Sequence, residues 1–213
     1  GAYIDIDWLF KLKSADSPIV SERARVIKAL NATDGVQKTN RELIKESGAP
    51  AVGLFGRVNL QIFSIRKEEH KQKLFFDVLG LKPIFLKKDG TGKIDKDFQD
   101  KYKDVEEVKL YNELTKLNKL YNAYVKSFIR QWGSDADMRH DTRIRPRFGY
   151  LDVVTGRTSA KKPSLQQIPS RGQMGKNIKR LFVAEKGRLI IKVDYAAHEV
   201  RGWSIISGDV GVA

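Results

Sequence analysis

The chain has 213 residues, 41% of them hydrophobic and 31% charged, and its 40 Lys and Arg exceed its 26 Asp and Glu by a net charge of +14. It has no cysteine, which excludes disulfides, thiol nucleophiles and thiolate zinc sites. No run of the roughly 20 apolar residues needed for a membrane span and no signal peptide is evident, so we expect no membrane partner. An excess of positive charge this large favours a nucleic acid over a merely solubilising surface.

The N-terminal third predicts helices and then an irregular stretch. Apolar residues recur at a helical period on either side of Ser17-Pro18, which is expected to separate two helices. Residues 33–60 are punctuated by glycine and proline, so we expect an irregular insertion with one short helix at Arg41–Glu46.

The middle of the chain contains two further helical patterns. One covers Glu68–Leu79 and is expected to end at Gly80 as a C-terminal cap. The basic turn Lys87–Lys93 superficially resembles a phosphate loop, but Ile94 stands where that motif requires a hydroxyl, so a P-loop is rejected. The longest helix is predicted at Asp104–Trp132, where the basic residues gather on one face. That basic face is either solvated or a contact surface.

The C-terminal third of the chain predicts strands as well as short helices. Two segments rich in β-branched and aromatic residues, Arg147–Val154 and Leu189–Tyr195, predict strands. A polar stretch, Lys161–Gly175, lies between them, and short helices are expected at Met174–Phe182 and Glu199–Ile206. The three histidines, His70, His140 and His198, lack metal-ligand spacing, so no zinc site is expected.

One carboxylate stands at a position suited to chemistry. Asp194 ends the apolar Leu189–Tyr195 segment, where a strand would hold it rigidly and leave it accessible to substrate. Carboxylate oxygens suit Mg²⁺, which takes its remaining ligands from phosphates and water. The alternative interpretation is that Asp194 caps the helix that follows.

Two polar segments upstream suit contact with nucleic acid. Arg157 projects from a tight turn at Gly156, and the following loop, Pro163–Arg171, is held extended by two prolines. The side chains of this loop offer hydrogen bonds without bulk, which suits the nearly sequence-independent minor groove. An ordinary polar loop is the alternative.

These segments resemble the signatures of family A (DNA polymerase I type) DNA polymerases. Thr155–Arg157, Leu165–Pro169 and Arg171 are similar, in the same order, to the family signatures T-G-R and N-L-Q-N-I-P-x-R. Asp194–Arg201 resembles the family's motif A, D-Y-S-Q-I-E-L-R. Further similar segments are Gly1–Leu12, Phe75–Leu81, Tyr111–Leu117 and Ser207–Asp209, so the resemblance covers most of the chain except about residues 33–60.

The resemblance implies an α+β fold and an incomplete polymerase domain. Residues 1–65 would be an N-terminal helical segment with an irregular insertion, residues 66–141 a helical thumb, and residues 142–213 a partial palm with an antiparallel sheet. The implied activity is template-directed DNA synthesis in replication or repair, with Mg²⁺ at a two-metal site. The implied partners are primer-template DNA, dNTPs and the remaining polymerase portion, in the same parent chain or a second one.

The resemblance also implies a role for each matching residue. Asp194 and the backbone carbonyl of Tyr195 would be metal ligands, and Glu199 would be the steric gate against the ribonucleotide 2′-OH. The implied DNA contacts are Lys116, Arg157, Ser164, Gln166, Gln167 and Arg171.

Several positions depart from the family pattern. Ser164 and Gln167 replace the usual asparagines, Asn112 replaces an arginine, and Ala196–His198 replaces S-Q-I in motif A. This divergence suggests a phage-like source and a cytoplasmic setting in a bacterium or an infected host cell.

The family's second carboxylate motif and its fingers helix are not found in this sequence. Two-metal phosphoryl transfer requires both carboxylates, so we expect this chain alone to be inactive. A non-catalytic DNA-binding module on a polymerase scaffold is the main alternative. A single-subunit RNA polymerase is a weaker one, against which Glu199 and Thr155–Arg157 argue.

Overall fold

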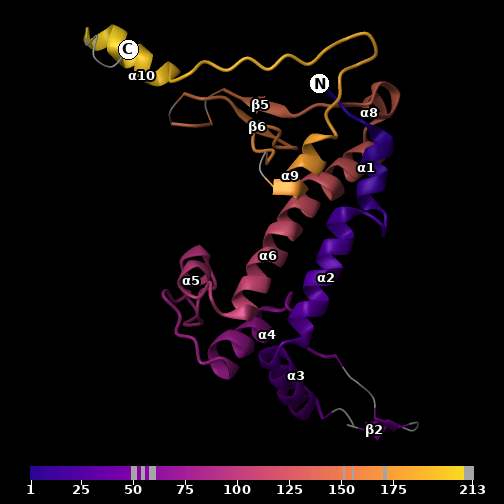
Figure 1. Cartoon of the computed structure of the whole chain (residues 1–213), viewed down its shortest axis with the longest axis vertical. Coiled ribbons are helices and arrows are strands. Elements are labelled where there is room, and N and C mark those ends of the chain that lie inside the picture. Colours follow the sequence, from indigo (N-terminus) through magenta and orange to yellow (C-terminus); the bar gives the residue numbers. More distant parts are fainter. Residues whose placement is uncertain are drawn as a thin grey trace.

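The computed structural model describes residues 1–48, 52–53, 56–57, 61–150, 152–154, 156–169 and 172–208. Two long helical rods run side by side through the molecule; the helices within residues 34–101 lie toward one end, and the strands within residues 147–161 lie at the other (Figure 1). Among these residues, no helix is both long enough and apolar enough to cross a membrane.

The first rod consists of two helices that meet at Ser17-Pro18, where the sequence predicts a break. Helix α1 (Ile6–Lys13) begins where the Asp5 carboxylate accepts a hydrogen bond from the Trp8 amide at 2.8 Å. Helix α2 (Pro18–Ala32) starts with proline at its first position and Ser17 as its N-cap. Two local stop and start signals therefore fix this boundary.

Helix α3 (Asp34–Ser47) corrects the expectation of an irregular stretch from residue 33 with only a short helix at Arg41–Glu46. Gly35 does not break the helix, because its amide donates to Glu107 Oε1 at 3.2 Å and a side chain there would collide with that carboxylate. The helix ends at Gly48, which has a left-handed backbone. Beyond it, β2 (Val52–Gly53) pairs antiparallel with β3 (Gly56–Arg57).

The helix predicted at Glu68–Leu79 is confirmed, with a wider second half. It consists of α4 (Glu68–Gln72) followed by the π-helix η1 (Lys73–Val78), and Gly80 after it has a φ of 62°. The short helix α5 (Lys96–Lys101) packs its buried Phe98 against Phe75, with ring centroids 5.8 Å apart.

The second rod is the longest helix that the sequence predicts. It runs through α6 (Glu106–Leu120), the π-helix η2 (Tyr121–Lys126) and α7 (Ser127–Ser134). Helix α8 (Ala136–Asp141), which the sequence pattern did not predict, follows directly, with the Asp135 carboxylate accepting from the Met138 amide.

Buried apolar side chains form two clusters along the rods. The cluster near the strand pairs joins α1 to the second rod and includes Leu9, Phe128 and Met138. The other, near the opposite end, joins α2 and α3 to η1 and α6 and includes Leu30, Phe75 and Leu114. Segments far apart in the sequence therefore share each core.

The strands form small antiparallel pairs, in agreement with the α+β fold class. Strand β1 (Ala2–Tyr3) pairs with β4 (Arg143–Ile144), and β5 (Arg147–Gly149) pairs with β6 (Ser159–Lys161). Helix α9 (Gly172–Lys179) lies against α6.

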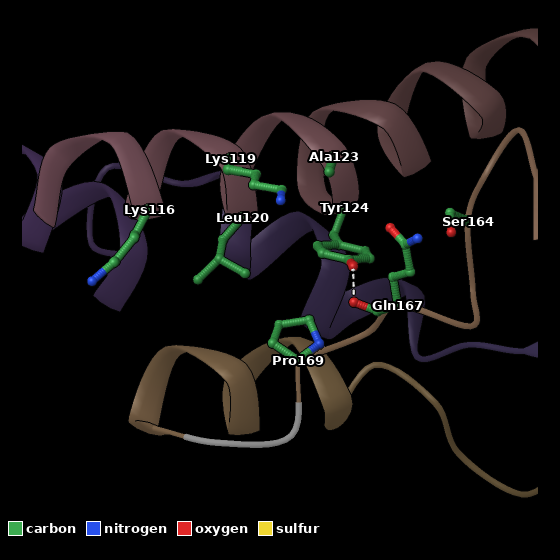
Figure 2. A pocket seen from close by; sticks show the side chains of 8 residues that line it. All are labelled: Lys116, Lys119, Leu120, Ala123, Tyr124, Ser164, Gln167 and Pro169. Atoms are coloured by element: carbon green, nitrogen blue, oxygen red, sulfur yellow. Dashed lines mark hydrogen bonds between the residues drawn. The ribbon is translucent and has the colours of Figure 1, made fainter. Parts of the chain in front are cut away.

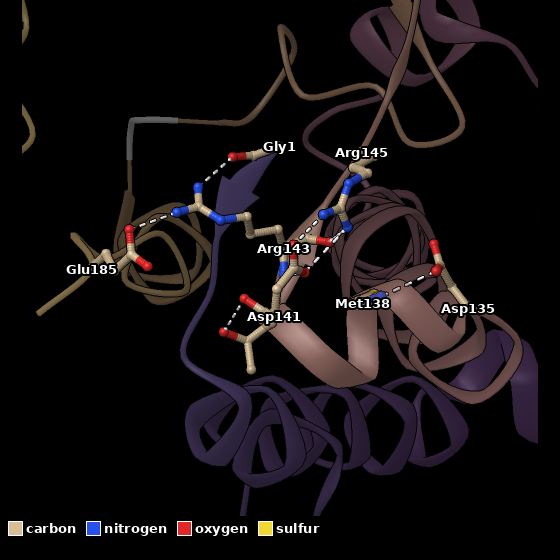
Figure 3. Close-up of polar contacts among 8 residues, drawn as sticks. Gly1, Asp135, Met138, Asp141, Arg143, Arg145 and Glu185 are labelled. Atoms are coloured by element: carbon tan, nitrogen blue, oxygen red, sulfur yellow. Dashed lines mark hydrogen bonds and ion pairs between the residues drawn. The ribbon is translucent and has the colours of Figure 1, made fainter.

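Arginine side chains tie these strands to their neighbours (Figure 3). The Arg143 guanidinium donates to the Gly1 carbonyl at 3.1 Å and to Glu185 Oε2 at 2.7 Å. Arg145 forms an ion pair with Asp141, and this hydrogen bond lowers the pKa of the Asp141 carboxyl. The N-terminus, the end of α8 and the segment after α9 are thus held together.

The expected strand at Leu189–Tyr195 is wrong for this structure, and the one at Arg147–Val154 is too long. Of the described residues in the latter segment, only Arg147–Gly149 form a strand pair. Residues 189–195 form no strand; they run extended to α10 (His198–Ser207), and Leu189 and Ile191 are 88% and 81% exposed (Figure 1). A strand needs a neighbour for its backbone hydrogen bonds, and the described residues supply none here.

Candidate nucleic-acid interface

A cavity of about 350 Å³ lies between the long second rod and the loop that precedes α9 (Figure 2). We call it the helix–loop cavity. Its walls are lined by Lys116, Lys119, Leu120, Ala123 and Tyr124 from the rod and by Ser164, Gln167 and Pro169 from the loop. Three of the residues predicted to contact DNA, Lys116, Ser164 and Gln167, therefore meet at one surface although they are far apart in the sequence.

Tyr124 links the two sides of this cavity. Its hydroxyl donates a hydrogen bond to the Gln167 carbonyl at 2.6 Å, and burial raises the pKa of the phenol. The ring is almost fully buried and packs edge-on against Phe128. The loop is thereby anchored to the rod at a defined position.

The charged groups of the cavity are both lysines. Lys116 and Lys119 are exposed and three residues apart on α6, so they lie on the same side of the helix. Neither forms an ion pair with another described residue. Both ammonium groups are available to an external anion.

Gln166 is predicted to contact DNA, but its side chain serves the loop itself. Its Oε1 accepts from the Ala160 amide at 2.8 Å, and its Nε2 donates to the Thr158 carbonyl at 3.0 Å. These bonds hold the end of the hairpin that β5 and β6 form. Gln166 does not line the helix–loop cavity.

Arg157 and Glu199, predicted to be a minor-groove contact and a sugar gate, form an ion pair with each other. Both side chains are mostly exposed, 69% for Arg157 and 74% for Glu199. They line a shallow hollow of about 410 Å³ together with Ala197, His198 and Val200. The turn before β6 is thus linked to the start of α10.

Asp194 and Tyr195 lie in the extended run before α10, and both are exposed. The helix-cap interpretation of Asp194 is wrong in this structure, since the N-cap of α10 is Ala197 and no side chain caps it. Within the described ranges, no group of three or more His, Cys, Asp or Glu is placed to hold a metal ion. These residues therefore do not by themselves form a complete magnesium site.

Some residues of the predicted motifs are not among the described residues. Arg171 lies outside the described residues, as does Thr155 of the T-G-R motif. Conversely, the sequence pattern did not single out Lys119, Tyr124 or Pro169 as site residues. A signal was available for Lys119 and Ala123, which follow Lys116 at intervals of three and seven residues, a spacing that keeps one helix face.

Comparison with known proteins identifies the family. The family model for DNA polymerase family A matches residues 33–212. DNA polymerase I of Thermus aquaticus is 28% identical over 187 residues, which cover 85% of this chain and 20% of that protein. A Thermus thermophilus DNA polymerase I is 31% identical over 153 residues, covering 69% of this chain and 17% of that protein.

A solved structure shows the same fold. It is the POL domain of Pol1 from M. smegmatis in complex with DNA primer-template and dNTP. The match has a TM-score of 0.58 at 22% identity and covers all of this chain and 32% of that chain.

The chain belongs to DNA polymerase family A. It spans about a fifth of the length of the curated relatives it matches.

Proposed function

We propose that this chain is the thumb and the first part of the palm of a template-directed DNA polymerase, and that it binds primer-template DNA. The observation that carries this proposal is the helix–loop cavity. There, two unpaired lysines of α6 and the polar loop Ser164–Pro169 face one another in a chain of net charge +14.

The lysine side of the helix–loop cavity suits the phosphate backbone of a duplex, and the loop side suits its minor groove. Lys116 and Lys119 can neutralise backbone phosphates, a contact that carries no sequence information. Ser164 and Gln167 offer hydrogen bonds to minor-groove acceptors, whose pattern is nearly the same for every base pair. Such a surface grips DNA of any sequence, as template-directed synthesis requires.

The exposed Asp194 and the Tyr195 carbonyl are proposed as this chain's contribution to a magnesium site. Magnesium, when bound, would supply Lewis-acid stabilisation of the phosphate charge. Among the described residues no group of three or more His, Cys, Asp or Glu could hold a metal ion, so the proposed site needs a further carboxylate from elsewhere. Glu199 is proposed as the gate against ribonucleotides, which requires its Arg157 ion pair to adapt when a nucleotide enters.

The proposed partner is the remaining polymerase portion, in the same parent chain or as a second chain. Apolar side chains at residues 189–193 are exposed, and Trp203, Ile205 and Ile206 on α10 are 72%, 82% and 83% exposed. Solvent-exposed apolar surface of this extent favours burial against another polypeptide. Further palm strands would also satisfy the unpaired backbone of residues 189–195.

Binding of primed duplex DNA at several salt concentrations tests the proposal. We expect affinity for fluorescently labelled DNA to fall steeply with salt and to vary little with sequence. Lys116→Gln should weaken binding for all sequences and make the salt dependence shallower, by about one unit of slope. Lys13→Gln, an exposed lysine outside the cavity, is the matched control and should change neither.

A non-catalytic DNA-binding module would pass the same binding test. The two functions differ once the rest of the polymerase domain is supplied. A polymerase then extends a primer, whereas a binding module does not.

A further inference from the structure

A second cavity, of about 470 Å³, opens on another side of the second rod. We call it the basic cavity. Its lining consists of Arg23, Arg66, Asn118, Tyr121, Asn122 and Lys126. Lys116 lines the helix–loop cavity and Asn118 the basic cavity, and two residues correspond to about 200° around an α-helix. The two cavities share no lining residue.

The basic cavity holds three cationic side chains and no carboxylate. Arg23, Arg66 and Lys126 form no ion pair within the part of the chain that the structure describes. Two residues further along α2, Arg25 bonds to both Glu22 and Glu113. Neutralising carboxylates are thus present near this helix, but not in the basic cavity.

Arg23 is held with one end of its guanidinium free. Its Nε donates to Asn118 Oδ1 at 2.8 Å, and its guanidinium carbon lies 4.6 Å from the centre of the Tyr121 ring. The terminal nitrogens Nη1 and Nη2 have no partner among the described residues. This fixed pair of donors matches the geometry of a phosphate group and loses little freedom when it binds one.

The electrostatics of the basic cavity also favour the binding of an anion. Burial lowers the pKa of Arg23 from its ordinary value, and the positive charge of Arg66 lowers it further. This partly buried guanidinium lies beside a second one and has no carboxylate partner among the described residues, although Tyr121 raises its pKa in part. A bound anion would relieve both effects.

We propose that the basic cavity binds a phosphate group, separately from the helix–loop cavity. Arg23 supplies the two directed hydrogen bonds, Arg66 and Lys126 neutralise the charge, and the Asn122 amide adds a donor. The phosphate belongs either to a free inorganic ion such as pyrophosphate or to the backbone of a single nucleic-acid strand behind the second rod. This inference does not depend on the helix–loop cavity binding DNA.

The test measures binding of pyrophosphate and of a short single-stranded oligonucleotide to the whole chain by calorimetry. Arg23→Gln and Arg66→Gln should each weaken binding by about tenfold, since a charged hydrogen-bonding group is lost. Arg66 is exposed, so its substitution should leave the fold intact and protects the test against unfolding of the Arg23 variant. Arg25→Gln, which removes the same charge from the same helix, should have less than a twofold effect.

The outcomes separate the two sources of phosphate. Weakened pyrophosphate binding alone identifies a free ion, and weakened oligonucleotide binding identifies the backbone of a strand. Lys116→Gln should affect primed duplex but not pyrophosphate, so failure of the proposed function would be seen independently. Equal effects of Arg23→Gln, Arg66→Gln and Arg25→Gln, or no binding of either probe by the unaltered chain, would overturn the proposal.

Discussion

His70 is a buried histidine whose proton positions follow from its contacts. It is 5% exposed, stacks on Phe63, and its Nδ1 accepts a hydrogen bond from the Ser64 amide at 2.9 Å. A ring nitrogen that accepts cannot carry a proton, so the folded chain holds the neutral imidazole. Burial lowers the pKa of His70 below 6.5, and the charge of Lys67 lowers it further.

This arrangement predicts a loss of stability in mild acid. The unfolded chain binds a proton at His70 more readily than the folded chain does, so the stabilisation is complete above the unfolded pKa of 6.5. It is lost as pH falls from there through the lower folded pKa. Urea unfolding at several pH values should show this decline, and His70→Gln should make it shallower. His140→Gln, at an exposed histidine, should leave the decline as it is.

The ion pair between Arg157 and Glu199 concerns selectivity more than stability. Exposed pairs of this kind stabilise a fold by about 0–1 kcal/mol, so it can open at little cost when a nucleotide binds. In the complete polymerase domain, Glu199→Ala should retain substantial synthesis with dNTPs and accept rNTPs more readily. Single-turnover rates with both nucleotides measure this. Unchanged discrimination would remove Glu199 from the proposed gate.

At the scale of elements, the link between η2 and the Ser164–Pro169 loop is the most specific contact of the helix–loop cavity. A π-helix has a wider turn than an α-helix and is found often at functional sites. Here the π-helix presents Tyr124, whose hydroxyl fixes the backbone of Gln167. This hydrogen bond, together with Leu165 and Ile168 packed against the apolar cluster, sets the position of the loop relative to Lys116.

Removing the Tyr124 hydroxyl should weaken the contact between the rod and the loop but leave the apolar core packed. Tyr124→Phe keeps the ring against Phe128 but leaves the Gln167 carbonyl without its partner. We expect a destabilisation of about 1 kcal/mol and weaker binding of primed duplex. Unfolding midpoints and fluorescence anisotropy measure the two effects. Tyr150→Phe, at a side chain that is 73% exposed, should produce neither.

Elements fixed by local signals could be predicted from the sequence. The break at Ser17-Pro18 and the long second rod follow from capping residues and apolar periodicity. Helix α3 could not, because Gly35 resembles a helix breaker until Glu107 approaches it from a distant segment. The strand pattern at residues 189–195 is local, but pairing requires a neighbour.

The residues of the candidate site also divide into those that a local motif predicts and those whose contacts depend on tertiary structure. Family-like motifs pointed to Lys116, Ser164 and Gln167, and the fold brings all three to one cavity. The bonds of Gln166 within its own loop, and the pairing of Arg157 with Glu199, depend on tertiary geometry. No local pattern carries that information.

At the scale of the whole molecule, the two ends of the chain differ in how completely they are packed. Two apolar clusters secure both rods, while the C-terminal run and α10 leave large apolar side chains in solvent. Asp194 lies in that exposed part. The proposed catalytic carboxylate therefore lacks the rigid surroundings that positioning in a polymerase active site requires.

This incompleteness predicts that the 213-residue chain alone incorporates no nucleotide. One carboxylate cannot hold two metal ions in line with the attacking and leaving oxygens. Primer extension with purified chain, Mg²⁺ and dNTPs is the measurement. Template-dependent extension by the chain alone would contradict the requirement for a second carboxylate.

In the complete polymerase domain, continuous or reassembled from two chains, Asp194→Asn is the decisive substitution. Asparagine keeps the size of the side chain but removes the negative charge that would bind Mg²⁺. The single-turnover rate should fall by about three orders of magnitude or more, because phosphoryl transfer depends almost entirely on positioning and electrostatic stabilisation. DNA affinity should change little, since a carboxylate near phosphates opposes binding. Asp152→Asn, a carboxylate paired with Lys161 on the β5–β6 hairpin, is the control and should retain activity. If Asp194→Asn keeps near-normal turnover, Asp194 is not a metal ligand and the proposed active site must be abandoned.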